Sequence, residues 1–231
     1  MIYSWVNRYD AILQIQEIYP DLQISEEKED LIALEGSICI NRKTSDFTLY
    51  KEYKVKILIF KDENKLPQVY DIGCQINSDY PHRYEDGMLC LDTDVAIKIR
   101  YEDGMDLCSW MQNFVEAFYF SYEYFRRNGE YPFGERKHGS DGVIETYSGY
   151  FRVTGKANVL NCIRYIAVQN YDGHDQCPCG SKKYIRKCHG KYILPFYNNR
   201  KRLEIVKNDY EKIMKEVFLK QYATRNRKKA K

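Results

Sequence analysis

The chain carries little net charge, because 36 basic residues stand against 33 acidic ones and leave a formal charge of +3. Such a balance does not require a polyanion as partner. Residues 225–231 form a basic end that can contact nucleic acid or an acidic protein, although runs of this kind are usually just solvated. We therefore do not expect nucleic acid to be the main partner.

Long apolar segments are also missing. No window of about 18 apolar residues occurs, and the first residues lack the basic stretch followed by an apolar segment that marks an export signal. We expect a cytoplasmic protein that does not enter a membrane. In such a protein the eight cysteines serve as metal ligands, core residues or a reactive thiol rather than as disulfides.

A Gly-x-Gly-x-x-Gly phosphate-binding loop and internal repeats are likewise absent from the sequence. We therefore do not expect this chain to activate an acyl group with ATP by itself. Its 231 residues are enough for one domain of about 150 residues and a small appendage.

What the chain does have is a compact set of metal-binding residues near its C-terminus. Cys177, Cys179, Cys188 and His189 lie within thirteen residues. Thiolate sulfur and imidazole nitrogen are the usual ligands of tetrahedral structural zinc sites, and this segment supplies four of them. Gly180 permits a tight turn between the ligands. The spacing predicts a bound Zn²⁺.

Residues 177–190 also resemble the SEC-C motif, a short zinc-binding module. Its pattern is Cys-x-Cys-Gly-Ser, a basic and aromatic run, and then Cys-His or Cys-Cys, and all four ligand positions match here. The resemblance implies the same cofactor. It does not imply an activity, because such modules are appended to many kinds of protein.

Hydrophobic periodicity in the first half of the chain predicts an α+β fold. Apolar residues at helical spacing indicate a helix over residues 5–18. Residues 31–40, 53–60 and 68–72 are expected to be strands. The polar turns between them are short, which favours an antiparallel meander over crossover connections. Residues 106–127 predict the main buried helix.

The second half is expected to be helical. Residues 81–103 show no clear period, and residues 129–149 have the composition of a loop. Residues 157–168 predict a short helix, and residues 200–223 predict a terminal amphipathic helix. Its apolar face carries Leu203, Val206, Tyr210, Ile213 and Val217.

Residues 80–92 read Tyr-Pro-His-Arg-Tyr-Glu-Asp-Gly-Met-Leu-Cys-Leu-Asp. This segment resembles the active-site region of ubiquitin-conjugating enzymes, in which His-Pro-Asn, a short polar stretch and Gly-x-Ile precede the catalytic Cys-Leu-Asp. The matching positions are Pro81, Gly87, Cys90, Leu91 and Asp92. His82 stands where the family has asparagine, and Tyr80 stands where it has histidine.

The histidine at position 82 is similar to a divergent bacterial branch of this family. In that branch His, an aromatic residue two positions on, Asp-Gly and Leu-Cys recur together, and residues 128–139 resemble it as well. Proteins of the branch occur in anti-phage operons of the CBASS type, beside a cyclic-nucleotide synthase, or beside a ubiquitin-like modifier and its activating enzyme. The resemblance covers about residues 1–150.

The resemblance implies a UBC-like catalytic domain in residues 1–155, followed by a helical linker, the zinc motif and the terminal helix in residues 156–231. It implies that Cys90 carries an acyl group as a thioester and passes it to a lysine of a partner protein. His82 would stabilise the oxyanion or accept a proton. Asp92 would orient the incoming amine or take its proton.

Two other functions remain open. One is a non-catalytic UBC-fold module that has a structural zinc site and binds a protein or nucleic acid. The other is a cysteine hydrolase that uses Cys90 with His82 or His138, although the sequence shows no third group to orient the base. His138 lies either near the active site or in solvent.

The remaining cysteines are interpreted as packing residues. Cys39, Cys74 and Cys162 have apolar neighbours in the sequence, which favours a place in the core. Cys108 stands at the start of the predicted main helix, where burial is again favoured.

Overall fold

The computed structural model describes residues 8–62, 64–132, 134 and 137–229, with side chains from residue 9 to residue 219. The fold is mixed α+β, and its contacts divide the chain into two compact units. Unit 1 consists of residues 1–92 and 103–135, and unit 2 consists of residues 93–102 and 136–231. This division differs from the predicted boundary after residue 155, because residues 139–151 pack with the C-terminal helices.

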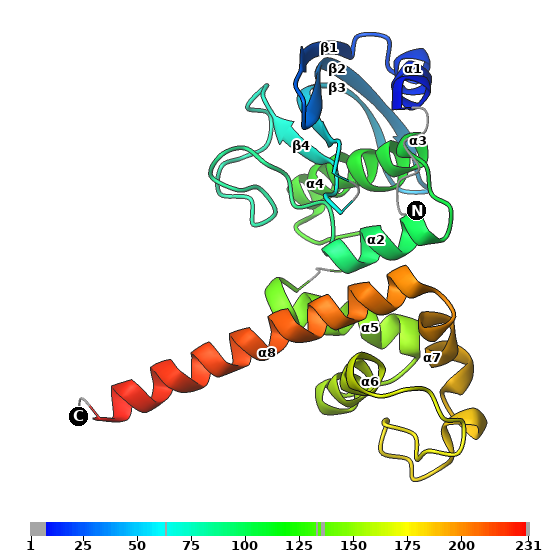
Figure 1. Ribbon diagram of the computed structural model, residues 1–231. Coiled ribbons are helices and arrows are strands. Elements are labelled where there is room, and N and C mark those ends of the chain that lie inside the picture. The colour runs from blue at the N-terminus through cyan, green and yellow to red at the C-terminus, as the bar shows by residue number, and fades with distance from the viewer. Residues whose placement is uncertain (1–7, 63, 133, 135–136, 230–231) are drawn as a thin grey trace. The chain divides into compact units, whose positions relative to one another are not determined.

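Unit 1 is built on a four-stranded antiparallel sheet in the order β1-β2-β3-β4 (Figure 1). The strands are β1 (Gln23–Glu27), β2 (Leu31–Lys43), β3 (Thr48–Phe60) and β4 (Gln68–Asp71). The predicted antiparallel meander is therefore confirmed. Strand β1 was not predicted, because its polar sequence lies mostly exposed at the sheet edge and carries no alternating pattern.

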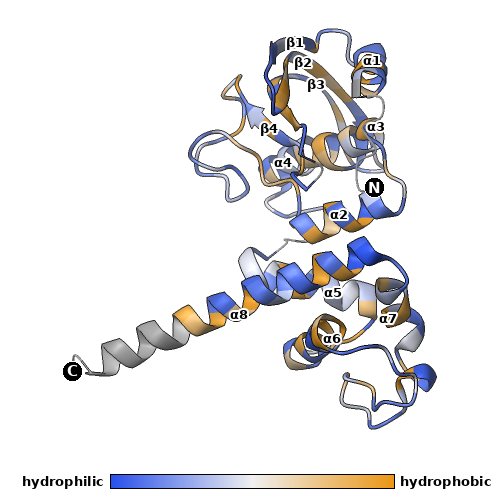
Figure 2. Ribbon diagram, viewed as in Figure 1, coloured by the Kyte–Doolittle hydropathy of each residue, from blue (hydrophilic) through white to orange (hydrophobic). Residues whose placement is uncertain are grey.

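The core of unit 1 forms on one face of the sheet. Hydrophobic colouring runs along much of β2 and β3 (Figure 2), and Tyr53, Val55, Ile57 and Ile59 of β3 alternate inward and are fully buried. Helix α4 (Glu116–Asn128) covers this face. The rings of Tyr53 and Tyr119 stack there with their centroids 4.0 Å apart.

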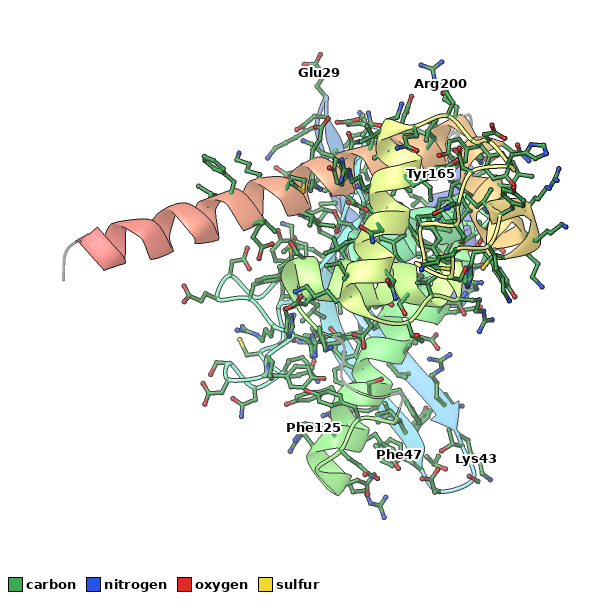
Figure 3. The ribbon with its side chains drawn as sticks, turned by 90° about the horizontal axis from the view of Figure 1, so that it is seen from below. Glu29, Lys43, Phe47, Phe125, Tyr165 and Arg200 are labelled. Carbon is green, nitrogen blue, oxygen red and sulfur yellow. The ribbon has the colours of Figure 1, made fainter. Side chains whose placement is uncertain are left out.

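The helices of unit 1 follow the predicted pattern. The main helix runs through α3 (Leu107–Trp110), a π-helical turn η2 (Met111–Val115) and α4. Asp106 is the N-cap residue of α3, and its carboxylate accepts a hydrogen bond from the Ser109 N–H at 2.7 Å. Helix α1 (Arg8–Ile18) confirms most of the predicted N-terminal helix, whose residues 5–7 lie outside the described part. Figure 3 shows Phe125 of α4 and Phe47 of the β2–β3 turn at the same end of unit 1.

Unit 2 consists of helices. They are α2 (Asp94–Glu102), α5 (Gly139–Phe151), α6 (Lys156–Val168), a 3-10 turn η3 (Ile185–Lys187), α7 (Gly190–Tyr197) and α8 (Arg200–Lys229). Their shared core includes the fully buried Tyr147, Phe151, Ile163, Ile193 and Val206. No helix in the described part of the chain is both long and apolar enough to cross a bilayer.

The C-terminal helices partly correct the sequence predictions. Helix α6 is confirmed, and α8 is confirmed with Val206 and Ile213 buried, although Val217 is 39% exposed. The loop predicted over residues 129–149 is wrong for its second half, which forms α5. That helix holds three glycines, which lower its intrinsic propensity, and packing of Tyr147 and Phe151 stabilises it instead.

A buried carboxylate links two helices of unit 2. The Tyr147 hydroxyl donates a hydrogen bond to Asp209 Oδ2 at 2.8 Å, and Asp209 is only 7% exposed. Burial raises the pKa of Asp209, whereas the hydrogen bond from Tyr147 and the charges of Lys212 and Lys98 act in the opposite direction; Asp94 raises it further.

The raised pKa predicts how stability depends on pH. Because the folded protein holds the Asp209 proton more tightly than the unfolded chain, this contribution to stability is fully present below the unfolded pKa and is lost as pH rises through the folded pKa. We expect Asp209→Asn, which can still accept from Tyr147, to stabilise the protein by about 1 kcal/mol at pH 7.5 and by much less at about pH 3.5, below the unfolded pKa. Urea unfolding at both pH values checks this. An equal gain at both would contradict it.

Candidate functional site

The segment that carries Cys90 is a tight loop hydrogen-bonded to β4. The Leu89 N–H donates to the Val69 carbonyl at 2.8 Å, and the Asp71 N–H donates to the Gly87 carbonyl at 3.0 Å. The turn itself closes through the Gly87 N–H, which donates to the Tyr84 carbonyl at 3.0 Å. Gly87 has φ of +88°, which favours glycine at this position. The edge of the sheet thus fixes the loop.

This loop brings two of the predicted site residues together. The Cys90 N–H donates to the His82 carbonyl at 2.8 Å, so the two residues lie on opposite strands of the turn. A ring nitrogen of His82 lies within 4.8 Å of Cys90 Sγ. Cys90 is partly exposed. The arrangement places an imidazole beside a thiol that solvent can reach.

Aromatic rings hold the imidazole of His82. The Tyr80 ring meets it edge to face at 5.5 Å, and the Tyr131 ring does so at 5.8 Å with an interplanar angle of 86°. Tyr131 in turn stacks on Phe125 of α4 with the ring centroids 4.5 Å apart. The sequence motif includes Tyr80, but Tyr131 lies about fifty residues further on and no spacing rule indicates it.

Asp92 belongs to unit 1 and His138 belongs to unit 2. Asp92 is partly exposed and lies two residues after Cys90, where the chain leaves unit 1 to enter α2. His138 is exposed and directly precedes α5 in unit 2. Their predicted roles remain predictions.

A buried ion pair lies beneath the loop. The Asp71 carboxylate has no exposed side-chain surface and accepts a hydrogen bond from the Ile76 N–H at 2.8 Å. Arg83 Nε lies 4.0 Å from Asp71 Oδ2, and its side chain is 14% exposed. Because Asp71 lies on β4 and Arg83 lies on the loop that carries Cys90, the pair joins this loop to the sheet.

Arg83→Met tests this connection. Removing one partner leaves a buried charge uncompensated, so we expect a loss of about 3 kcal/mol in the free energy of unfolding. The double variant Asp71→Asn/Arg83→Met is expected to lose less than the sum of the two single changes, because it leaves no buried charge. Chemical denaturation of the four proteins measures the coupling. Strict additivity would show that the pair contributes nothing.

The second candidate site is the cluster of Cys177, Cys179, Cys188 and His189. Their ligand atoms all lie within 4.8 Å of one another, which is the arrangement of a metal site. Cys179 Sγ and Cys188 Sγ are 3.7 Å apart, and His189 Nδ1 lies 3.4 Å from Cys177 Sγ and 3.2 Å from Cys188 Sγ.

These distances can be compared with the edges of a metal tetrahedron. Bonds of about 2.3 Å to sulfur and about 2.0 Å to nitrogen give edges of about 3.8 Å between sulfurs and about 3.5 Å between sulfur and nitrogen. The observed distances of 3.7, 3.4 and 3.2 Å lie close to these values. Three of the six ligand pairs therefore have the spacing of a tetrahedral site, and the other three lie within 4.8 Å.

Local backbone geometry explains why the ligands converge. The Cys177 N–H donates to the Lys183 carbonyl at 2.7 Å, which closes a hairpin-like turn, and Gly180 in that turn has φ of +83°. The Tyr165 hydroxyl, on α6, donates to Asp175 Oδ2 at 2.7 Å just before the first ligand. We call residues 176–191 the knot.

The thiols near the knot have different acidities. Burial raises the pKa of Cys177 to about 11. Burial also acts to raise the pKa of Cys179, but hydrogen bonds from Ser181 and from neighbouring thiols outweigh it and lower that pKa to about 6. Cys162 of α6 is fully buried, and burial raises its pKa to about 12. Cys162 is therefore a packing residue, as predicted.

Two of the remaining cysteine predictions are wrong. Cys39 and Cys74 are exposed rather than buried, and Cys108 is partly buried. Cys39 lies on β2, where the residues on either side are buried and the alternation turns its own side chain outward. In a strand with only one buried face, apolar neighbours in the sequence therefore do not predict that a residue is itself buried.

No protein-family model matches the chain, and neither a curated protein nor a solved structure matches it significantly. Its function is therefore inferred from the residues and distances of these two sites.

Proposed function

We propose that unit 1 is a UBC-like domain and that the protein is an acyltransferase, which carries an acyl group as a thioester on Cys90 and passes it to a lysine of a partner protein. The observation that carries the proposal is the His82 ring nitrogen within 4.8 Å of the partly exposed Cys90 Sγ. The hydrogen-bonded loop holds both residues before any substrate arrives.

The first step loads the enzyme. The Cys90 thiolate attacks the carbonyl carbon of a donor thioester, a new carbon–sulfur bond forms, and the donor sulfur leaves as a thiolate. Reaction with a bulky donor requires an accessible sulfur. The partial exposure of Cys90 supports this requirement.

The second step transfers the acyl group. The lysine amine attacks the thioester carbonyl, the carbon–nitrogen bond forms, and Cys90 leaves as a thiolate. His82 can donate an N–H to the oxyanion of the tetrahedral intermediate or accept the proton that the amine loses. The edge-to-face contacts with Tyr80 and Tyr131 would keep the imidazole directed at this carbonyl. Asp92 would orient the amine or take its proton.

The partners follow from the chemistry of these steps. A separate activating enzyme, or a donor that is already activated, must supply the thioester. On the resemblance of residues 80–92 and 128–139 to the bacterial branch, we place the protein in the cytoplasm, in anti-phage defence of the CBASS type, where the acceptor is a cyclic-nucleotide synthase primed by the transfer. A ubiquitin-like modifier with its activating enzyme is the other donor system that the resemblance implies.

We propose that the ion of the knot is Zn²⁺. Three thiolates and one imidazole form a closed set that leaves no open position for substrate, so the ion would be structural and would supply no catalytic chemistry. The Ser181 hydroxyl lies 3.2 Å from Cys188 Sγ, which is hydrogen-bonding distance for an outer partner of a metal ligand.

Transthiolation with a defined donor tests the acyltransferase proposal. The purified protein is incubated with a short peptide C-terminal thioester, and the adduct is mapped by peptide mass spectrometry without reductant. We expect acylation at Cys90 at least tenfold faster than at the exposed Cys39 and Cys74, with reversal by excess thiol. Equal labelling of the three cysteines would refute a specific site.

His82→Ala tests the second step separately from the first. We expect it to lower aminolysis of the loaded thioester about 100-fold, because one transition-state contact is lost, while loading changes little. His82→Asn distinguishes the two roles of the imidazole, since an amide donates to an oxyanion but does not accept a proton at neutral pH. Single-turnover transfer to lysine measures both variants. Unchanged transfer in His82→Ala would remove His82 from the mechanism.

The alternative is a non-catalytic UBC-fold module with a structural zinc site that binds a protein or nucleic acid. The observation that favours this alternative is the knot, because a structural metal site can serve a binding module whether or not Cys90 is catalytic. A protein that shows no preferential acylation of Cys90 yet still depends on the knot for partner binding would support it.

A further inference from the structure

The knot has a strongly asymmetric charge. Residues 176–203 contain no aspartate or glutamate, and they contain eight lysine and arginine residues. Five of these are on or next to the metal cluster and are exposed: Lys182, Lys183, Arg186, Lys187 and Lys191. Across the described part of the chain, none of the five takes part in an ion pair. A nearly neutral protein thus concentrates positive charge on one small element.

An exposed aromatic ring lies among these charges. Tyr184 is 50% exposed, although it stands next to the fully buried Ile185. The Arg186 guanidinium lies over its ring at 5.9 Å from the centroid, and the His174 ring meets it edge to face at 6.2 Å. Backbone pairing with Gln176 fixes the position of Tyr184. The ring is therefore ordered without being part of the core.

The acidic groups near this face have other partners. The Asp172 carboxylate lies 3.4 Å from Nδ1 of the His174 ring. The hydrogen bond from the His174 N–H is the main cause that lowers the pKa of Asp172, and the charge of Arg186 also lowers it. Asp175 accepts from Tyr165. Both precede the first ligand, so neither interrupts the basic run that follows it.

We propose that the knot binds single-stranded nucleic acid, with Tyr184 as a stacking platform for a base and with Lys182, Lys183 and Arg186 contacting the backbone phosphates. An acidic peptide would contact only the basic side chains, and its binding would not require the exposed ring of Tyr184. Single-stranded binding sites combine basic residues with aromatic rings on which bases stack. This role is independent of acyl transfer by Cys90.

The proposal is tested with the full chain and a labelled 20-nucleotide oligo-U RNA, by fluorescence anisotropy at 100 and 200 mM NaCl. We expect Tyr184→Ala to weaken binding about tenfold and Tyr184→Phe to stay within about twofold of the wild type. Lys182→Gln/Lys183→Gln is expected to weaken binding and to reduce its salt dependence. Metal content and thermal midpoint confirm that each variant keeps its fold.

Three further samples decide between sources of binding. A 20-residue poly-glutamate peptide represents an acidic partner, and a duplex of the same sequence length tests strand preference. The variant Lys228→Gln/Lys229→Gln/Lys231→Gln removes charge from the basic chain end. The proposal would be overturned if the protein did not bind RNA, or if Tyr184→Ala left binding unchanged. Equal affinity for poly-glutamate or for the duplex would also overturn it, and so would a loss of binding in the chain-end variant alone.

Discussion

Replacing Cys90 by serine is expected to lower acyl transfer to an amine by about 1,000-fold or more. A hydroxyl is far less ionised than a thiol at neutral pH, so loading slows, and any ester that forms is a poorer acyl donor than a thioester. The same change is expected to leave the fold intact, because Cys90 is only partly buried and serine is of similar size.

The measurement uses intact mass for loading and single-turnover transfer to lysine for the second step. Cys74→Ser and Cys39→Ser are matched controls, since both thiols are exposed and neither lies in the loop of His82. We expect both controls to load and transfer like the wild type. If Cys90→Ser keeps its activity, both the acyltransferase and the hydrolase interpretations fail together.

The sequence indicated the sheet of unit 1 because its strands obey a simple rule. In β3 the buried Tyr53, Val55, Ile57 and Ile59 alternate with less buried residues, and this period of two holds from Tyr53 to the end of the strand. The register follows from the short polar turns. Helix α5 was not predicted from the sequence, because its glycines and polar residues have low helix propensity. Packing in the core of unit 2 stabilises this helix instead.

The two candidate sites differ in how local they are. All four ligands of the knot come from thirteen neighbouring residues, so their spacing alone predicted the cluster. The surroundings of Cys90 come from further away. The motif contains His82, but the buried Asp71 beneath the loop and the Tyr131 ring beside the imidazole come from segments on either side of it. Only the folded chain shows that they meet.

The metal cluster leads to the prediction with the largest effect on stability. Cys188→Ser is expected to abolish tight binding of Zn²⁺ and to lower the free energy of unfolding of unit 2 by about 3 kcal/mol or more, because metal binding and folding of such a segment are one process. The loss would spread to α7, which starts directly after His189, and to α6, on which the knot packs.

Cys162→Ala is the matched control for this change. Cys162 is a fully buried thiol in the same core, but it is not one of the four clustered ligands. We expect it to keep one zinc per chain and to cost about 1 kcal/mol, as a small core truncation does. Metal content, far-ultraviolet circular dichroism and tryptophan fluorescence separate the outcomes. The two tryptophans, Trp5 and Trp110, both belong to unit 1.

The pattern across these three signals is the decisive result. Cys188→Ser should lose metal and helical signal while the tryptophan emission stays native, because both tryptophans belong to unit 1, which has its own sheet and core. A chelator added to the wild type should reproduce the same pattern. If Cys188→Ser retains a full zinc equivalent, or if it loses the metal without any loss of helix, the ion does not hold unit 2 together.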